Sequence, residues 1–238
     1  MNLKPFWKYY GGKWRAAPHY PVPVHAIIVE PFAGAAGYSL RYADRNIVLV
    51  EKDPSVAATW RYLLRVTSQE VLDLPDIRYD QSIDDLPGLQ EEARMLIGWW
   101  VNTGTAHPRK RPSARMRSGV WPNTFWGPAA RERIASQVDA IRHWTLLEGD
   151  YTKAPDVEAT WFIDPPYAHA GRHYAQQPDN FDALGAWCQT RNGQVMVCEN
   201  VGATWLPFQP FMDIKANEGR HGGKVSHEAL WVKPSLDL

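Results

Sequence analysis

Short apolar runs alternate along the chain with segments whose apolar residues are spaced as in amphipathic helices. Runs of this kind are typical of strands buried on both faces of a sheet, and they lie at 24–29, 46–50, 159–163 and 194–198. The stretches 89–101 and 131–144 have helical spacing, and a further helix is expected to start with Asp179 or Asn180 as its N-cap. This alternation predicts an α/β fold with a mainly parallel sheet.

Two segments between these elements are rich in proline and charge. Residues 72–87 contain acids and prolines, which predict a connector with short helices. Residues 107–119 carry too much proline and charge for a core element and predict an extended loop. Trp99 and Trp100 fall within helix 89–101, where we expect them to serve packing.

The most informative motif directly follows the apolar run 159–163. It reads Asp164-Pro165-Pro166-Tyr167, so a carboxylate, a rigid turn and an aromatic ring meet where a strand ends. Asp164 and the carbonyl of Pro165 would accept the hydrogens of an exocyclic amino group on a nucleobase and so expose its lone pair. Tyr167 would stack on a base taken out of its helix. The alternative is a plain Asp-Pro turn that only ends the strand.

A second motif follows the first apolar run and brings backbone close to a cofactor. Glu30-Pro31-Phe32-Ala33-Gly34-Ala35-Ala36-Gly37 is a glycine-bearing turn, and residues 38–43 after it are expected to be helical. Glu51 ends the next strand about 20 residues beyond this turn, where Rossmann-like folds place an acid on ribose hydroxyls. The turn lacks the full G-x-G-x-x-G pattern, which disfavours a nicotinamide cofactor.

Together and in this order, the two motifs resemble the Dam-like (D12 class) N6-adenine DNA methyltransferases. Near the N-terminus, Lys8-Tyr9-Tyr10-Gly11-Gly12-Lys13 is similar to the K-W-A-G-G-K element that closes over S-adenosylmethionine in that family. The turn from Glu30 to Gly37 is similar to the family's E-P-F-x-G-x-G loop, with the last glycine shifted by Ala36. Glu51 stands where the family has its ribose-binding acid.

The resemblance continues through the second half of the chain. Asp150-Tyr151 is similar to the D-F pair that the family places beside the cofactor adenine. Cys198-Glu199-Asn200 is similar to the S-N pair at a strand end, and residues 214–231 are similar to the family's final hairpin. The matches therefore run along nearly the whole chain, with a variable middle.

The resemblance implies a Rossmann-like seven-stranded methyltransferase sheet whose last strand is antiparallel. It assigns 1–65 and 145–238 to the catalytic domain and 66–144 to a small helical target-recognition lobe. The catalytic turn would be Asp164, Pro165, Pro166 and Tyr167. The residues expected to bind S-adenosyl-L-methionine are Tyr9, Tyr10, Lys13, Glu30, Pro31, Phe32, Ala33, Gly34, Gly37, Glu51, Lys52, Asp150, Tyr151 and Asp164.

Charge is segregated along the chain, although 26 basic and 26 acidic residues cancel overall. Residues 68–95 hold eight acids against two bases, whereas 107–143 hold eight bases against two acids. We expect double-stranded DNA to meet the basic segment while the acidic one faces solvent or solvates a linker. The residues expected to bind DNA are Arg109, Lys110, Arg111, Arg115, Arg117, Trp121, Trp126 and Arg172. The alternative is a solvated basic loop anchored by aromatics.

Composition adds few constraints. The 238 residues suit one domain, or one domain and a small lobe. No apolar run is long enough for a membrane span, and no secretory signal precedes the fold, so we expect a cytoplasmic protein with reduced Cys188 and Cys198. His169 and His173 lack further ligands at metal spacing, and no metal is expected. A monomer is favoured.

The sequence thus predicts methyl transfer from S-adenosylmethionine to the N6 amino group of a flipped adenine at a specific site in duplex DNA. Cytosine-N4 methylation needs the same amino chemistry and remains an alternative. An RNA or protein amide methyltransferase is disfavoured, because those relatives prefer Asn at the position of Asp164. A DNA-binding protein that retains the fold without turnover is the alternative from another class.

Overall fold

The computed structural model describes residues 2–120, 122–168, 176–215 and 225–234. Within them, seven strands form one sheet in the order β3-β2-β1-β4-β5-β7-β6. β7 is antiparallel to both of its neighbours, and the pairs from β3 to β5 are parallel. The strands are β1 (Ile27–Glu30), β2 (Asn46–Glu51), β3 (Thr145–Glu148), β4 (Ala159–Ile163), β5 (Gly193–Asn200), β6 (Gln209–Lys215) and β7 (Val225–Val232).

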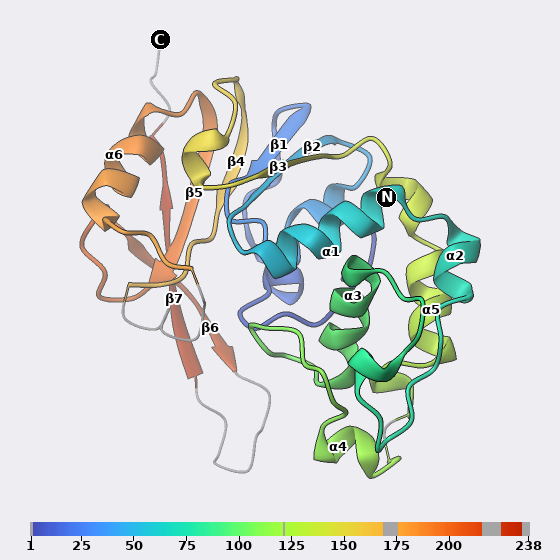
Figure 1. The fold of residues 1–238 in the computed structure, drawn as a ribbon. Coiled ribbons are helices and arrows are strands. Elements are labelled where there is room, and N and C mark those ends of the chain that lie inside the picture. Colours follow the sequence, from blue (N-terminus) through green and yellow to red (C-terminus); the bar gives the residue numbers. More distant parts are fainter. Residues whose placement is uncertain (1, 121, 169–175, 216–224, 235–238) are drawn as a thin grey trace.

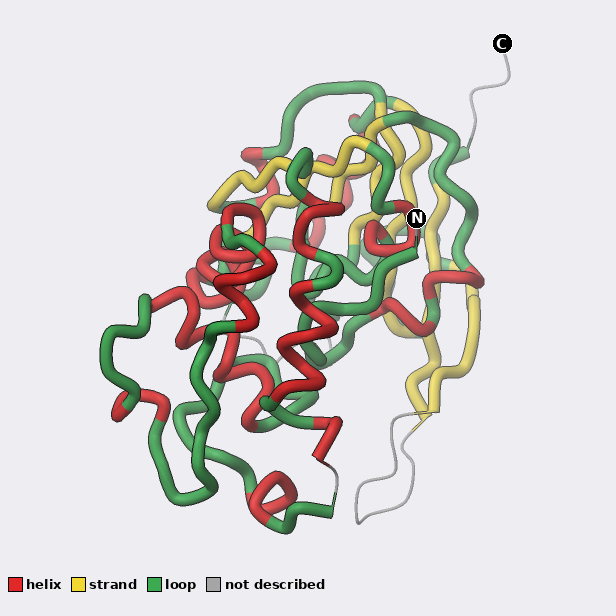
Figure 2. The backbone as a smooth tube through the Cα atoms, turned by 90° about the vertical axis from the view of Figure 1, so that its right-hand side faces the viewer, coloured by secondary structure: helices red, strands yellow, loops and turns green. Residues whose placement is uncertain are grey.

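The helices cover both faces of this sheet and extend beyond it. In Figure 1, α6 lies on one side of the strands and α1 on the other, and Figure 2 shows most of the helices gathered away from the strands. The helices are α1 (Pro54–Arg65), α2 (Ser68–Leu72), α3 (Glu91–Val101), α4 (Ala114–Arg117), α5 (Pro128–Ala135) and α6 (Phe181–Thr190). The predicted N-cap of α6 is confirmed, because the Asn180 side chain accepts a hydrogen bond from Ala183 N.

Alternating residues of the central strands pack into two separate cores. Phe162 of β4 joins a large apolar cluster on the side of α1 and α3, and Trp161 joins a second cluster with Leu184 of α6. Because successive side chains of a strand point to opposite faces, an entirely apolar run is what a sheet covered on both faces requires. The predicted α/β class with a mainly parallel sheet is therefore confirmed.

Several predicted elements differ in the structure. Residues 38–43 form only a 3-10 turn, Ser39–Tyr42, rather than an α-helix. The predicted helix 131–144 is wrong as drawn, because α5 begins earlier, at Pro128, and a 3-10 turn, Val138–Ile141, follows it. Proline at the first helical position moves the start, since its fixed φ suits that position. The loop 107–119 contains α4, which the Ser113 side chain caps.

The helices between 66 and 144 share their core with the sheet. Trp99 and Trp100 of α3 are buried, as predicted, in the same cluster as Trp60 of α1. Their indole N–H groups donate to Thr59 Oγ1 and to Phe6 O, both at 2.9 Å. The described residues of the lobe therefore share their apolar core with the sheet, and the assignment of the lobe to target recognition stays a prediction.

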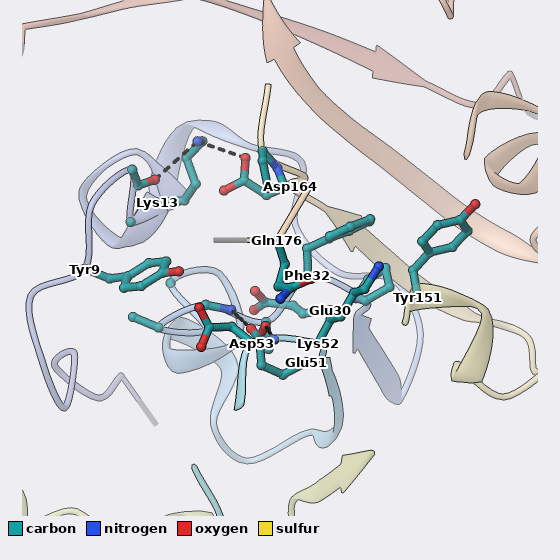
Figure 3. A pocket seen from close by; sticks show the side chains of 18 of the residues that line it. Tyr9, Lys13, Glu30, Phe32, Glu51, Lys52, Asp53, Tyr151, Asp164 and Gln176 are labelled. Atoms are coloured by element: carbon teal, nitrogen blue, oxygen red, sulfur yellow. Dashed lines mark hydrogen bonds and ion pairs between the residues drawn. The ribbon is translucent and has the colours of Figure 1, made fainter. Parts of the chain in front are cut away.

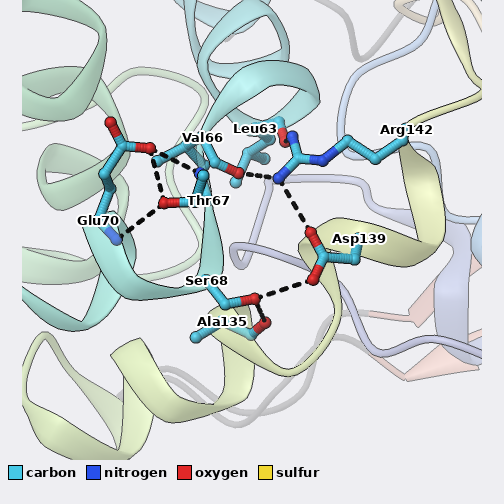
Figure 4. Close-up of polar contacts among 8 residues, drawn as sticks. All are labelled: Leu63, Val66, Thr67, Ser68, Glu70, Ala135, Asp139 and Arg142. Atoms are coloured by element: carbon cyan, nitrogen blue, oxygen red, sulfur yellow. Dashed lines mark hydrogen bonds and ion pairs between the residues drawn. The ribbon is translucent and has the colours of Figure 1, made fainter.

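Arg142 joins this lobe to the C-terminal end of α1 (Figure 4). Its guanidinium donates to Leu63 O at 3.3 Å and to Val66 O, and it pairs with Asp139 at 3.1 Å. The last carbonyls of a helix lack intrahelical partners and carry partial negative charge. Arg142 therefore stabilises the point where α1 ends and α2 begins.

We expect Arg142→Met to lower the free energy of unfolding by about 1–2 kcal/mol, because the α1 carbonyls lose a charged donor. For a chain of this size the midpoint of thermal unfolding would fall by about 2–8 °C. Arg78→Met is the matched control, since Arg78 is 78% exposed and pairs only with the equally exposed Asp80. Circular dichroism melts of both variants test this, and equal melting of the two would contradict it.

Among the described residues, no helix is long and apolar enough to cross a membrane. Both cysteines are buried and free, as predicted.

Candidate functional site

An open pocket lies at the carboxyl ends of the central strands (Figure 3). β1 ends there at Glu30 and β2 at Glu51, and β4 ends at Ile163, directly before Asp164. β1 pairs with β2 on one side and with β4 on the other, so the order of the strands reverses at this point. Such a reversal is where open α/β sheets bind ligands.

The structure brings every residue expected to bind the cofactor to this one pocket. Segments far apart in the chain meet there: the N-terminal element, the glycine-bearing turn, the ends of β2 and β4, and Asp150-Tyr151. Of the catalytic turn, Asp164 and Pro166 line the pocket. Gly11, Gly12 and Ala35 of the two predicted motifs also line it. The lining residues that no cofactor motif included are Asp53, Phe162, Gln176, Gln177 and Pro178.

Gly37 allows the N-terminal element to lie directly on the turn. A Cβ added at Gly37 would be 2.5 Å from Trp14 N and 2.9 Å from Lys13 N, far inside van der Waals contact. Gly34 has a φ of +45°, and an added Cβ there would be 3.1 Å from the Tyr9 ring. The close contact between turn and N-terminal element fixes the position of Lys13, whose side chain points into the site.

Two buried carboxyl groups form the floor of the pocket. Glu51 accepts hydrogen bonds from Gly34 N at 2.9 Å and Asp53 N at 2.8 Å, and Glu30 accepts one from Ser39 N at 2.7 Å. Burial raises the pKa of Glu51 to about 7 and the pKa of Glu30 to about 8. Backbone N–H groups thus hold the Glu51 carboxyl group in place, and a carboxylate has further lone pairs that can accept from a ligand.

Lys13 and Asp164 form an ion pair at the opposite wall. Lys13 Nζ lies 2.9 Å from Asp164 Oδ1 and 3.3 Å from Gly11 O, and it sits 4.7 Å from the centroid of the Tyr167 ring. Burial raises the pKa of Asp164, and the charge of Lys13 opposes that shift. Burial also raises the pKa of Tyr167 well above its usual value, so its phenol keeps its proton. The charge of Lys13 thus favours the ionised form of Asp164 at the carboxyl end of β4.

The third wall combines a charge pair with stacked rings. Lys52 Nζ lies 3.6 Å from Asp150 Oδ2. Phe32 and Tyr151 are stacked with centroids 5.6 Å apart. Apolar faces beside a few converging polar groups are typical of pockets for small organic ligands.

The basic segment and the acidic segment are side by side rather than on separate faces. Ile83 N donates to Lys110 O at 2.8 Å, Lys110 Nζ pairs with Asp84 at 2.8 Å, and Arg111 donates to Asp80 O at 3.2 Å. The two segments therefore contact each other at these residues, and the binding of DNA to the basic segment stays a prediction. Among the basic residues expected to bind DNA, those that the structure describes are exposed: Arg109, Lys110, Arg111, Arg115 and Arg117.

Trp126 is a core residue in the structure. Its side chain is 5% exposed, and its indole N–H donates to Pro75 O at 2.8 Å. Trp126 therefore presents no face for stacking on a base. The basic residues near it in the sequence gave no indication that its side chain is buried. Trp121, Arg172, His169 and His173 lie outside the described residues.

In the described part of the chain, no three His, Cys, Asp or Glu side chains are grouped as metal ligands would be. No protein-family model matches the chain, and no curated protein matches it. A solved structure described as a conserved hypothetical protein of Streptococcus pyogenes is similar over 91% of this chain and 89% of its own, at 14% identity and a TM-score of 0.39. A likeness at that level says nothing about function.

Proposed function

We propose that the protein is a DNA methyltransferase that moves a methyl group from S-adenosylmethionine to the N6 amino group of adenine. One observation supports this proposal most strongly: the glycine-bearing turn, Glu51 and Asp164 line the same pocket. There, Lys13 forms an ion pair with Asp164. A cofactor site and an amino-binding carboxylate are thus within reach of each other. The order of the strands, with β7 antiparallel, also fits the sheet that the family resemblance implies.

The residues of the pocket fit the cofactor. Glu51 has lone pairs left for two ribose hydroxyls, and Asp150, which pairs with Lys52, offers acceptors to an adenine amino group. The Phe32 ring suits the flat face of adenine. When bound, S-adenosylmethionine supplies an electrophilic methyl group on a sulfonium.

The chain itself positions and orients the reacting amino group. Asp164 would accept one of its hydrogens and the Pro165 carbonyl the other, which localises the nitrogen lone pair. Tyr167 would stack on the flipped base. Holding the amino group and the methyl donor in line accounts for most of the rate enhancement. The amino group needs no strong base beforehand, because the methylated nitrogen is acidic and loses its proton afterwards.

The exposed arginines of 109–117 supply the affinity for duplex DNA. Phosphate contacts by arginine are independent of sequence and weaken with salt. The neighbouring acids Asp80 and Asp84 already bind part of this segment, so DNA would compete with them for Lys110 and Arg111.

Transfer of radiolabelled methyl from S-adenosylmethionine tests the proposal when duplex DNA, RNA and a protein mixture are offered in parallel. We expect label in duplex DNA and none above background in the other two. Label in RNA or protein alone would contradict the assignment of duplex DNA as the substrate. Cofactor binding by calorimetry without transfer to any of them would favour a non-catalytic DNA-binding protein.

We also expect affinity for S-adenosylmethionine to rise with pH between about 6 and 8, because the pKa of Glu51 is raised to about 7. Hydroxyl donors favour the ionised carboxylate, and the ionised fraction of Glu51 grows as the pH passes its pKa. Glu51→Gln should weaken binding by about tenfold and remove the step near pH 7. Calorimetric titrations across this range test it, and a step that persists in the variant would assign the titration to another group such as Glu30.

A further inference from the structure

A buried carboxylate that the proposed mechanism does not use lies beside the Asp164 turn. Glu228 belongs to β7 and is 5% exposed. It pairs in register with Asn200 of β5 and with Met212 of β6, so the hairpin carries it to the side of the pocket. A carboxylate is almost never this buried unless it has partners that stabilise it.

The partners of Glu228 belong to the predicted catalytic turn and its cation. The phenol of Tyr167 donates a hydrogen bond to Glu228 Oε2, and Lys13 Nζ lies 3.7 Å from the same oxygen. Ser226 Oγ donates to the other oxygen at 2.8 Å. Glu228 therefore fixes the tip of the Tyr167 ring, while Lys13 links it to Asp164.

The backbone after the ring is anchored separately. Ala168 N donates to Glu199 Oε2 at 3.0 Å, and the indole N–H of Trp205 donates to the same oxygen at 3.1 Å. Glu199 precedes Asn200, the last residue of β5, and is fully buried. With the backbone attached to β5, the hydrogen bond to Glu228 restrains the swing of the Tyr167 ring, and the phenol also lies within hydrogen-bonding reach of Asp164.

One face of that ring is already occupied. Lys13 Nζ lies over it, 4.7 Å from the centroid. A base that stacks on Tyr167 would take the opposite face, and the ring must be held still for that face to be available. A ring held in one orientation binds with a smaller loss of entropy than a rotating one.

We propose that Glu228 is a positioning residue that holds the Tyr167 ring in place to receive the target base. This inference rests on the proposed function, because it assigns Tyr167 the stacking role. Glu228 acts through the phenol and does not touch the substrate. Its removal leaves the cofactor half of the pocket intact and loosens the hold on the tip of the ring.

Activity of single and double variants tests this role. Glu228→Ala should lower kcat by about 10–100-fold while the Kd for S-adenosylmethionine stays within about twofold. Glu228→Gln should recover part of the loss, because its amide oxygen still accepts from the phenol. In the Tyr167→Phe background, Glu228→Ala should add little further loss. If kcat of the double variant falls by the product of the two single-variant factors, the two residues act independently and the proposal is overturned.

Asp213→Ala is the matched control, because Asp213 is a carboxylate on β6 of the same hairpin, 67% exposed and paired with His227 at 2.7 Å. It should keep full activity. If kcat falls as much in Asp213→Ala as in Glu228→Ala, the effect comes from a general disturbance of the hairpin, and the proposal fails.

A second measurement separates this inference from the proposed function. The protein is labelled with 3-fluorotyrosine, and the Tyr167 fluorine resonance is assigned from its absence in Tyr167→Phe. We expect that resonance to shift or sharpen in Glu228→Ala and to stay unchanged in Asp213→Ala. An unchanged resonance in Glu228→Ala overturns the proposal, whether or not the wild-type protein methylates DNA. If the wild-type protein is inactive but the Tyr167 resonance changes in Glu228→Ala as expected, only the proposed function is contradicted.

Discussion

Asp164→Ala is expected to abolish methyl transfer while leaving cofactor binding largely intact. The carboxylate accepts the amino hydrogen and orients the nitrogen, so its loss should lower kcat by about 1,000-fold or more. The glycine-bearing turn, Glu51 and Asp150 do not depend on it, and Lys13 keeps Glu228 as a partner at 3.7 Å. Single-turnover rates together with calorimetric titration of S-adenosylmethionine measure the two effects separately.

Glu158→Ala is the control for this variant. Glu158 precedes the amino end of β4, at the opposite edge of the sheet from Asp164, and is 76% exposed. Its removal should leave the rate unchanged. Turnover by Asp164→Ala close to that of the control would contradict the role assigned to Asp164.

Gly37→Ala is expected to have the largest effect on stability. The added Cβ would lie 2.5 Å from Trp14 N, and backbone on both sides leaves little room to yield. We expect a loss of about 3 kcal/mol in the free energy of unfolding. Any folded fraction should also bind S-adenosylmethionine more weakly, because Lys13 must move away from Asp164. Thermal melts and calorimetry test the two effects.

Gly127→Ala is the matched control for Gly37→Ala. Gly127 precedes α5 in an extended conformation with φ 163°, and nothing lies within 4 Å of an added Cβ. Its free energy of unfolding should change by less than about 0.5 kcal/mol. Equal stability of the two variants would mean that the N-terminal element does not lie on the turn as the structure has it.

The sequence predicts the sheet well, because parallel strands buried on both faces leave a continuous apolar signal. β4 matches its predicted range residue for residue. β3 gave no such signal, since its four residues are exposed or only partly buried at the edge of the sheet. α1 was not predicted either, although Asp53 before Pro54 is a good helix start, with the Asp53 side chain accepting from Ser55 N at 2.8 Å.

The pocket is predictable to the extent that its residues carry local motifs. Glu30, Glu51 and Asp164 each end a strand, and parallel strands bring such ends to one edge. Gln176 carries no motif, and only the folded chain brings it to the pocket. Glu228 falls in the predicted hairpin 214–231, but its contact with Tyr167 becomes visible only in the folded chain. Trp126 shows the reverse case, because its position among arginines suggested a DNA contact while its burial depends on packing against residues around Pro75.

The identity of the methylated nucleoside tests the central claim most directly. Duplex DNA is incubated with the protein and S-adenosylmethionine carrying a deuterated methyl group, digested to nucleosides and measured by mass spectrometry, with Asp164→Ala as the blank. We predict deuterated N6-methyladenine with the wild-type protein and none with the variant. Deuterated N4-methylcytosine would keep the amino chemistry but contradict the choice of adenine. No deuterated nucleoside, with S-adenosylmethionine shown to bind, would contradict DNA methylation by this protein.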